Sequence, residues 1–297
     1  MKILIIGKNG FIGRNLYEYF LASGRDVTAL ARTELNLLHE AEVRSYLQKM
    51  YFDIVIDAAI YNPRVGLNKN ASKEFEYDVR MFHNLAKCNK YYGKLIYFGS
   101  GAEYNKLYPI CSVKESDLKN DIPDNAYGMA KYIIGQEIEA GIYDSNNIYN
   151  LRVFGLFGKY ENWRSTFISG ACCKVIKDMP ITIRRNVIFD YLYIDDFCRM
   201  IDRFICMNKH GYRTYNITAG RRVSILQIAE TIMKISGKNT GIIVKNDGYA
   251  NEYTANSDRL FEEIGWNEIE PMEHSIKKLY DYYNQIKDMI DGELLDE

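Results

Sequence analysis

Three glycines near the N-terminus, Gly7, Gly10 and Gly13, constrain the fold of this chain more than any other feature. They follow a continuous apolar run over 2–6, which is typical of a buried parallel strand, and a helical apolar pattern begins beneath the third glycine. Gly7 permits a tight turn, Gly10 lets phosphates approach the backbone, and Gly13 lets helix and strand pack closely. Free N–H groups and the positive end of the helix dipole would then face a pyrophosphate.

The segment therefore predicts a dinucleotide-binding turn, although its spacing is G-x-x-G-x-x-G and not G-x-G-x-x-G. A plain strand-to-helix turn with accidental glycines is the alternative. We expect the cofactor to lie against the whole turn, which comprises Gly7, Lys8, Asn9, Gly10, Phe11, Ile12 and Gly13.

Bulk properties exclude several kinds of partner. The 297 residues carry a formal net charge of -1, so there is no electrostatic case for nucleic acid or an anionic membrane. No stretch approaches the roughly 20 apolar residues that span a bilayer, and no signal-peptide pattern precedes the first apolar run. The six cysteines lack the spacing of a zinc site. We expect a cytoplasmic protein with free thiols and no metal.

Strand-like and helix-like segments alternate through the first half of the chain. The expected strands are 2–6, 26–31, 54–58, 94–98 and 148–153, and the expected helices are 11–22, 39–49, 73–91 and 127–143. This alternation predicts an α/β fold with a Rossmann-type, doubly wound parallel sheet and helices on both faces. Further on we expect strands over 189–194, 212–218 and 242–245, and helices over 224–236 and 272–289, with Ser224 as an N-cap.

Two lobes follow from this pattern. Residues 1–155 are expected to form the dinucleotide-binding domain, to which 187–217 return. Residues 156–186 and 218–297 are expected to form a smaller C-terminal α/β lobe for the substrate.

The second expected strand ends beside Arg32, where dinucleotide folds select their cofactor. An acidic residue there favours NAD, whereas a basic residue accepts the extra phosphate of NADP. Arg32 and the nearby Lys8 lead us to expect NADP, with NAD left open. Ala58 and Ala59 end the third strand, where small side chains leave room for the dinucleotide, unless they are ordinary core residues.

Tyr127 and Lys131 are four residues apart and stand on one face of an expected helix. An unperturbed tyrosine is a poor acid or base at neutral pH, but a nearby ammonium favours its phenolate form. Lys131 can also hold the cofactor ribose. Most such pairs are solvated helix faces, and this pair gains force from its place between the fourth and fifth strands.

Ser100 follows the fourth strand between two glycines. A hydroxyl at the carboxyl end of a strand points into the ligand crevice of such a sheet, where it can hydrogen-bond a substrate carbonyl beside Tyr127. A simple turn serine is the alternative. Because Tyr127 and Lys131 are also present, we favour a catalytic role for Ser100 over a simple turn.

These motifs resemble those of the extended short-chain dehydrogenase/reductases, the NAD-dependent epimerase/dehydratase family of nucleotide-sugar enzymes. The glycine turn, the Ser-Tyr-Lys set and the stretches 151–158 and 190–196 occur in the family's order. The stretches 32–38 and 98–101 look most like GDP-fucose synthases and related 4-keto-sugar reductases. The resemblance implies that Ser100 and Tyr127 address the sugar C4 oxygen and that Lys131 positions the nicotinamide ribose. It further implies a C-terminal lobe that grips the nucleotide diphosphate.

Departures from the family pattern narrow the expected reaction. Ala102 stands where GDP-fucose synthases carry a cysteine, and no histidine occurs around 162–168, so both proton carriers for epimerisation at C3 and C5 are missing. Gly155 and Phe189 replace a usual Asn and Arg that serve the substrate. Glu103 lacks the acidic neighbour of the dehydratases. Arg184, Arg185 or Arg221 can supply a diphosphate contact, with surface arginine as the alternative. The expected substrate contacts are Ser100, Gly101, Glu103, Phe154, Gly155, Arg184 and Arg221.

The sequence therefore predicts NADP-dependent reduction of the C4 keto group of a nucleotide-linked deoxy sugar, for surface polysaccharide precursors. A nucleotide-sugar 4-epimerase that retains tightly bound NAD is the nearest alternative, and a non-catalytic dinucleotide sensor is an alternative of another class. The family also implies a homodimer, through the helices over 73–91 and 127–143.

Overall fold

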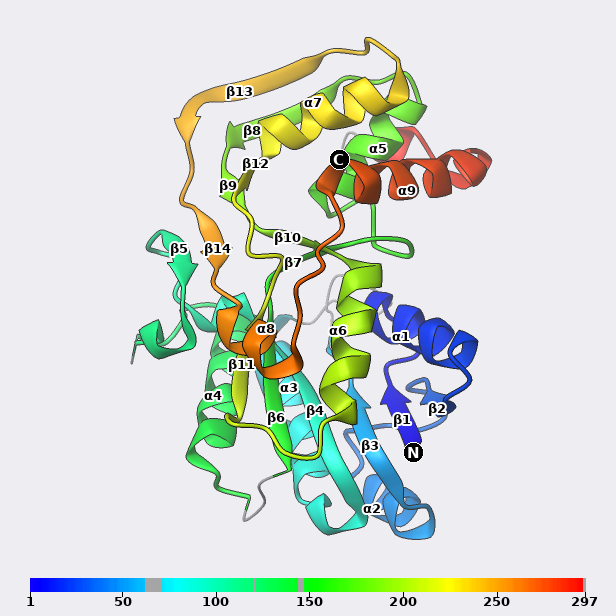
Figure 1. Ribbon diagram of the computed structural model, residues 1–297, viewed down its shortest axis with the longest axis vertical. Coiled ribbons are helices and arrows are strands. Elements are labelled where there is room, and N and C mark those ends of the chain that lie inside the picture. The colour runs from blue at the N-terminus through cyan, green and yellow to red at the C-terminus, as the bar shows by residue number, and fades with distance from the viewer. Residues whose placement is uncertain (62–70, 120, 144–146, 296–297) are drawn as a thin grey trace.

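A six-stranded sheet forms the centre of the protein in a computed structural model that describes residues 1–61, 71–119, 121–143 and 147–295 (Figure 1). Its order is β11-β6-β4-β3-β1-β2, and every neighbouring pair is parallel. The strands are β1 (Lys2–Ile6), β2 (Asp26–Leu30), β3 (Phe52–Asp57), β4 (Tyr92–Ser100), β6 (Ile148–Val153) and β11 (Thr214–Ile217). The predicted Rossmann-type α/β fold is confirmed.

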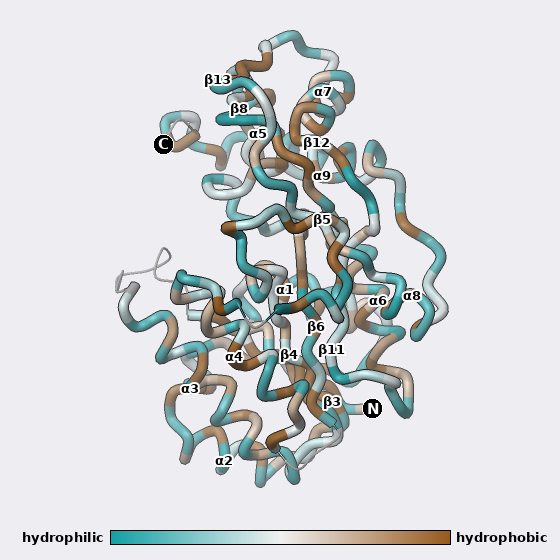
Figure 2. The backbone as a smooth tube through the Cα atoms, turned by 90° about the vertical axis from the view of Figure 1, so that its left-hand side faces the viewer, coloured by the Kyte–Doolittle hydropathy of each residue, from teal (hydrophilic) through white to brown (hydrophobic). Residues whose placement is uncertain are grey.

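Helices cover both faces of this sheet, and β1 shows why its apolar run is continuous. Ile3 and Ile5 pack into one core cluster with α1 (Phe11–Ala22) and α6 (Ile194–Cys206). Leu4 and Ile6 pack into the other, with α2 (Glu40–Lys49), α3 (Glu74–Ala86) and α4 (Ala126–Ala140). Alternate side chains of a strand point to opposite faces, so a strand buried on both faces has no polar side. Figure 2 shows the sheet between α3 on one flank and α6 on the other.

The second lobe lies beyond the carboxyl ends of the central strands (Figure 1). It contains α5 (Phe167–Ile176), α7 (Ile225–Ser236) and α9 (Met272–Gln285), together with the parallel pair β8 (Ile181–Asn186) and β13 (Ile242–Tyr249). Two small sheets link the lobes. One has the order β12-β9-β14-β5 and the other pairs β10 with β7. Their strands are β5 (Ile110–Val113), β7 (Gly155–Phe157), β9 (Ile188–Phe189), β10 (Tyr191–Tyr193), β12 (Val223–Ser224) and β14 (Tyr253–Ala255).

Several element predictions hold and several fail for local reasons. Ser224 caps α7, and its capping box with Gln227 is complete. The predicted strand over 189–194 is present as two short strands, β9 and β10, because the chain breaks at Asp190, whose carboxylate accepts the N–H groups of Ala219 and Arg221. The helices expected over 73–91 and 272–289 end earlier, at Ala86 and Gln285, and each is followed by a short 3-10 turn.

The chain from 194 to 217 packs with the first lobe. Its helix α6 contacts α1, and its strand β11 extends the central sheet beside β6. We propose the two-lobe division on these contacts. In the described part of the chain, no helix combines the length and apolar character needed to cross a membrane.

Candidate active site

The glycine turn joins the carboxyl end of β1 to α1 by close backbone packing. Gly7 has a φ of +96°, and a Cβ there would lie 2.6 Å from the carbonyl oxygen of Ala58. A side chain at Gly13 would collide with the carbonyl of Gly7. Helix α1 begins after Gly10 with no side-chain cap and no acidic residue in its first turn. A helix N-terminus of this kind fits a phosphate group, so the turn fits a dinucleotide.

The end of β2 carries a carboxylate that the sequence argument overlooked. Arg32 is exposed, as expected of a residue that meets a ligand. Lys8, however, lies 3.7 Å from Glu34, which also accepts the N–H of Ala31 at 2.8 Å. The expected cofactor site therefore holds a carboxylate in addition to the two cations Lys8 and Arg32. Glu34, two residues beyond Arg32, therefore adds a negative charge to the balance between NADP and NAD.

Lys131 points into the protein and not into bulk water. Its side chain is buried, and its Nζ donates to the carbonyl of Phe98 at 2.8 Å. The same Nζ lies 5.7 Å from the ring centre of Tyr127 and 4.4 Å from that of Tyr97. Because Phe98 is two residues before Ser100, this hydrogen bond fixes α4 against the end of β4. The Ser100, Tyr127 and Lys131 side chains thus come from elements that are packed together.

Ser100 sits at the carboxyl end of β4 and caps a short 3-10 turn. Its Oγ accepts the N–H of Ala102 at 3.1 Å, and its own N–H donates to Glu103 at 3.2 Å. Helix α4 approaches this turn so closely that a Cβ at Gly128 would lie 2.9 Å from the carbonyl of Ala102. Local packing therefore fixes the backbone of Ser100 from both sides.

Glu103 does not reach a substrate, contrary to the expectation from sequence. The side chain is fully buried, and Arg152 donates to it from Nε at 2.6 Å. Asn150 and the N–H of Ser100 occupy its remaining acceptor positions. Side chains at Gly99 or Gly135 would collide with the carboxylate, so two glycines make the space that holds it. Glu103 is therefore a buried charge that holds the backbone of Ser100 through a hydrogen bond from its N–H.

Three other expected substrate contacts, Gly101, Phe154 and Gly155, are packed against other parts of the protein. Gly101 is buried against Phe154 and the hydroxyl of Tyr253, which leaves it no open face for a substrate. Phe154 is itself mostly buried, and Gly155 packs on the carbonyl of Asp190. These three residues therefore shape the wall of the site.

The three arginines offered as alternatives for a diphosphate contact lie in two places, Arg184 and Arg185 on β8 and Arg221 before β12. Arg184 is exposed on β8, in the outer two-stranded sheet of the second lobe. One terminal nitrogen of Arg221 donates to the carbonyl of Glu270, and among the described residues its buried Nε has no hydrogen-bond partner. A diphosphate contact from one of these arginines stays a prediction.

Two buried carboxyl groups near Lys131 were missed. Asp57 ends β3 and Asp78 lies on α3, and both are almost fully buried. Burial raises the pKa of Asp57 to about 7, against the opposing effect of the Lys131 charge, and burial also raises the pKa of Asp78. Among the described residues, Asp78 Oδ2 and the Tyr97 hydroxyl have no hydrogen-bond partner. Buried polar atoms without partners suit a polar ligand, such as a cofactor ribose, beside Lys131.

The Asp57 carboxyl should make the stability of the cofactor-free protein depend on pH. The folded-state pKa of Asp57 is about 7, whereas the ordinary value is about 4. Between about pH 4 and pH 7 the folded protein therefore binds a proton that the unfolded chain has lost. The contribution of Asp57 to the free energy of unfolding is therefore fully present below about pH 4 and is lost as the pH rises through 7. Asp57→Asn cannot ionise, so its stability relative to wild type should rise with pH by a few kcal/mol, at about 1.4 kcal/mol per pKa unit.

Urea unfolding between about pH 5 and pH 8 measures this difference. Asp26→Asn, which removes an exposed carboxylate on β2, is the control and should show a constant difference from wild type. A constant difference for Asp57→Asn as well would contradict the prediction.

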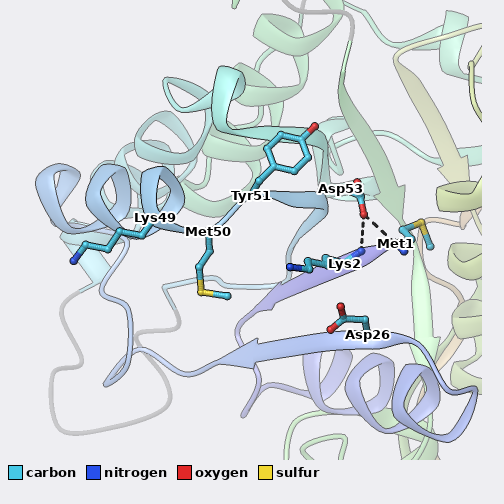
Figure 3. A pocket seen from close by; sticks show the side chains of 7 residues that line it. All are labelled: Met1, Lys2, Asp26, Lys49, Met50, Tyr51 and Asp53. Atoms are coloured by element: carbon cyan, nitrogen blue, oxygen red, sulfur yellow. Dashed lines mark hydrogen bonds and ion pairs between the residues drawn. The ribbon is translucent and has the colours of Figure 1, made fainter.

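A pocket at the opposite end of the sheet is separate from these residues. It lies at the amino ends of β1, β2 and β3, where Asp53 accepts the N–H of Lys2 at 2.6 Å (Figure 3). Parallel α/β sheets bind ligands beyond the carboxyl ends of their strands. The pocket therefore does not belong to the candidate site.

The parallel sheet, its helices on both faces and the glycine turn after its first strand together define a Rossmann-type dinucleotide-binding fold. The model of the NAD dependent epimerase/dehydratase family matches residues 3–218, and the chain belongs to this family. The resemblance predicted from the motifs is confirmed.

Similar proteins span almost the whole chain. GDP-L-colitose synthase of Yersinia pseudotuberculosis is 24% identical over 304 residues, which cover 95% of this chain and 98% of its own. The crystal structure of a GDP-L-fucose synthetase from Naegleria fowleri bound to NADP has a TM-score of 0.82 at 17% identity, and covers 96% of this chain and 93% of that one. The crystal structure of a UDP-glucose 4-epimerase from Thermotoga maritima with UDP-glucose has a TM-score of 0.80 at 18% identity. It covers 96% of this chain and 99% of that one.

Proposed function

We propose that this protein is a nucleotide-sugar 4-ketoreductase, which uses NADPH to reduce the C4 keto group of a nucleotide-linked deoxy sugar for surface polysaccharide precursors. The observation that carries the proposal is the buried Lys131, whose Nζ bonds to the end of β4 beside Ser100 and lies 5.7 Å from the ring centre of Tyr127. Family membership and the similarity to GDP-L-colitose synthase support a sugar nucleotide as substrate. A cytoplasmic location and a homodimer through α3 and α4 belong to the same proposal.

The three side chains divide the work of carbonyl reduction. NADPH, when bound, supplies the hydride. Ser100 holds the C4 oxygen by a hydrogen bond, and Tyr127 gives that oxygen a proton as negative charge develops on it. Lys131 stabilises the phenolate that Tyr127 leaves behind, and its hydrogen bond to Phe98 keeps the ammonium in place. Burial of Lys131 makes this charge more effective than an exposed lysine would be.

A 4-epimerase is the second candidate, because the same three residues serve it and because Glu34 adds a carboxylate near the adenosine end of the expected cofactor site. Such an enzyme would hold NAD tightly and consume none. The retained Tyr127 and Lys131 disfavour a non-catalytic sensor.

The test is a direct assay of the purified protein with NADPH and 4-keto-6-deoxy sugars linked to GDP, UDP, dTDP or CDP. We expect NADPH absorbance to fall in step with loss of the 4-keto sugar, and NADP to raise the melting temperature more than NAD. Interconversion of C4 epimers without NADPH loss, with a reduced-nicotinamide absorbance in the purified protein, would replace the reductase by the epimerase.

A further inference from the structure

We propose that Lys106 binds the diphosphate of the nucleotide-sugar substrate. The inference rests on the proposed function for the class of that ligand. Lys106 belongs to none of the motifs that the sequence predicts for the site. It lies between the short turn at 100–103, which we call the serine turn, and strand β5.

The Lys106 ammonium and the serine turn contact the same tyrosine ring. Nζ of Lys106 lies 4.5 Å from the ring centre of Tyr253. The hydroxyl of that ring lies so close to Gly101, in the serine turn, that a side chain at Gly101 would collide with it. Strand β14, which carries Tyr253, pairs with β5, the strand that follows Lys106 (Figure 1). The backbone pairing therefore keeps the lysine and the ring together.

The ring beneath Lys106 is packed against two other aromatic side chains. Its centre lies 5.1 Å from that of Phe154 and 5.6 Å from that of Phe189. Strand β9, which carries Phe189, also pairs with β14 in register with Tyr253. The ring is thus a fixed platform, and the ammonium above it has a defined place beside the candidate site.

The cations around the serine turn differ in what they already bind. Arg152 donates to Glu103 at 2.6 Å, and Lys131 Nζ donates to the carbonyl of Phe98 at 2.8 Å. Among the residues that the structure describes, the Lys106 ammonium pairs with no carboxylate and donates no hydrogen bond. An ammonium has three N–H donors and no acceptor. Lys106 is therefore the cation beside this turn that has donors and charge left for a ligand.

The electrostatic surroundings of Lys106 favour an anion. Although much of the side chain is exposed, its ammonium end is partly buried against the ring, and this burial lowers the pKa of the group. In the described part of the chain, no neighbouring charge opposes that effect. A bound anion would supply the missing counter-charge.

The position of Lys106 suits the diphosphate of the substrate and not that of the cofactor. The glycine turn for the cofactor follows β1, and β3 separates β1 from β4 in the central sheet. In a nucleotide sugar the diphosphate is attached at C1, across the sugar ring from C4. A substrate whose C4 oxygen meets Ser100 would place its diphosphate beyond one sugar ring, and Lys106 lies beyond one tyrosine ring from the same turn.

Calorimetric titration with nucleoside diphosphates tests this assignment without any turnover. GDP, UDP, dTDP and CDP are the probes, and the variants are compared on the one that wild type binds most tightly. We expect Lys106→Met, which keeps an unbranched apolar chain on the ring, to bind it roughly tenfold to a hundredfold more weakly, the usual loss for a hydrogen bond to a charged group. Lys106→Arg keeps the charge and should bind nearly as wild type.

Lys90→Met is the matched control and should bind the same probe as wild type does. Lys90 also lies over a tyrosine ring, 5.0 Å from the centre of Tyr91, but in the turn before β4 and thus at the opposite end of that strand from Ser100. NADP should raise the melting temperature of Lys106→Met as it does for wild type, because the glycine turn is untouched.

Equal affinities of Lys106→Met and wild type for the nucleoside diphosphate would overturn the inference, as would failure of wild type to bind any of the four. Loss of NADP binding by Lys106→Met would also overturn it, because the lysine would then serve the fold. Turnover of a 4-keto sugar by wild type, with unchanged nucleoside diphosphate binding in Lys106→Met, would defeat the inference alone. Binding that depends on Lys106, without turnover of any 4-keto sugar, would defeat the proposed function alone.

Discussion

Tyr127→Phe should lower turnover of 4-keto nucleotide sugars by about a thousandfold, while NADP binds as in wild type. The substitution removes only the hydroxyl that donates the proton, and general acid catalysis typically contributes about 10²–10⁴ in rate. Stopped assays measure kcat, and thermal shift with NADP measures cofactor binding. Tyr132→Phe is the control, because the Tyr132 hydroxyl on the same helix donates to the carbonyl of Lys119 at 3.3 Å. Turnover retained by Tyr127→Phe would exclude the proposed mechanism.

Lys131→Met should lower turnover to a similar extent for a different reason. The substitution leaves Tyr127 intact and removes the ammonium that stabilises its phenolate. It also leaves the carbonyl of Phe98 without the Lys131 donor, so the unfolding midpoint should fall together with activity. A variant that loses stability and keeps kcat would limit Lys131 to a structural role.

The elements that the sequence predicted well are those whose pattern lies within a few consecutive residues. The ranges of β1, α1 and β6 agree with prediction, because a buried parallel strand is a continuous apolar run and the glycines mark the turn. The pairing of Tyr127 with Lys131 follows from helical spacing alone. Each of these inferences needs only a window of a few residues.

The parts that failed depend on contacts between distant segments. The break at Asp190 follows from two N–H groups near Ala219. Burial of Glu103 depends on Arg152 and on the space at Gly135, neither of which lies near it in sequence. No motif search limited to single segments can detect such partners.

The buried pair of Glu103 and Arg152 should therefore have the largest effect on stability of any side-chain contact near the site. Glu103→Ala would leave the guanidinium of Arg152 buried without its carboxylate, and breaking such a pair costs about 3–5 kcal/mol. Urea unfolding measures that loss. Asp281→Ala is the control, since Asp281 pairs with Lys277 at 2.9 Å on an exposed face of α9, where ion pairs contribute about 0–1 kcal/mol. Equal midpoints for the two variants would contradict the prediction.

Removing both charges should restore much of that stability, because most of the loss in the single variant comes from the charge left behind and not from the bond itself. The double variant Glu103→Leu, Arg152→Met is expected to unfold at a higher urea concentration than Glu103→Ala. Its activity should nevertheless stay low, because the N–H of Ser100 loses the Glu103 acceptor that fixes the turn. Recovery of stability without recovery of kcat would show that this carboxylate positions Ser100 in addition to balancing Arg152. Recovery of both would confine the pair to the folding of the core.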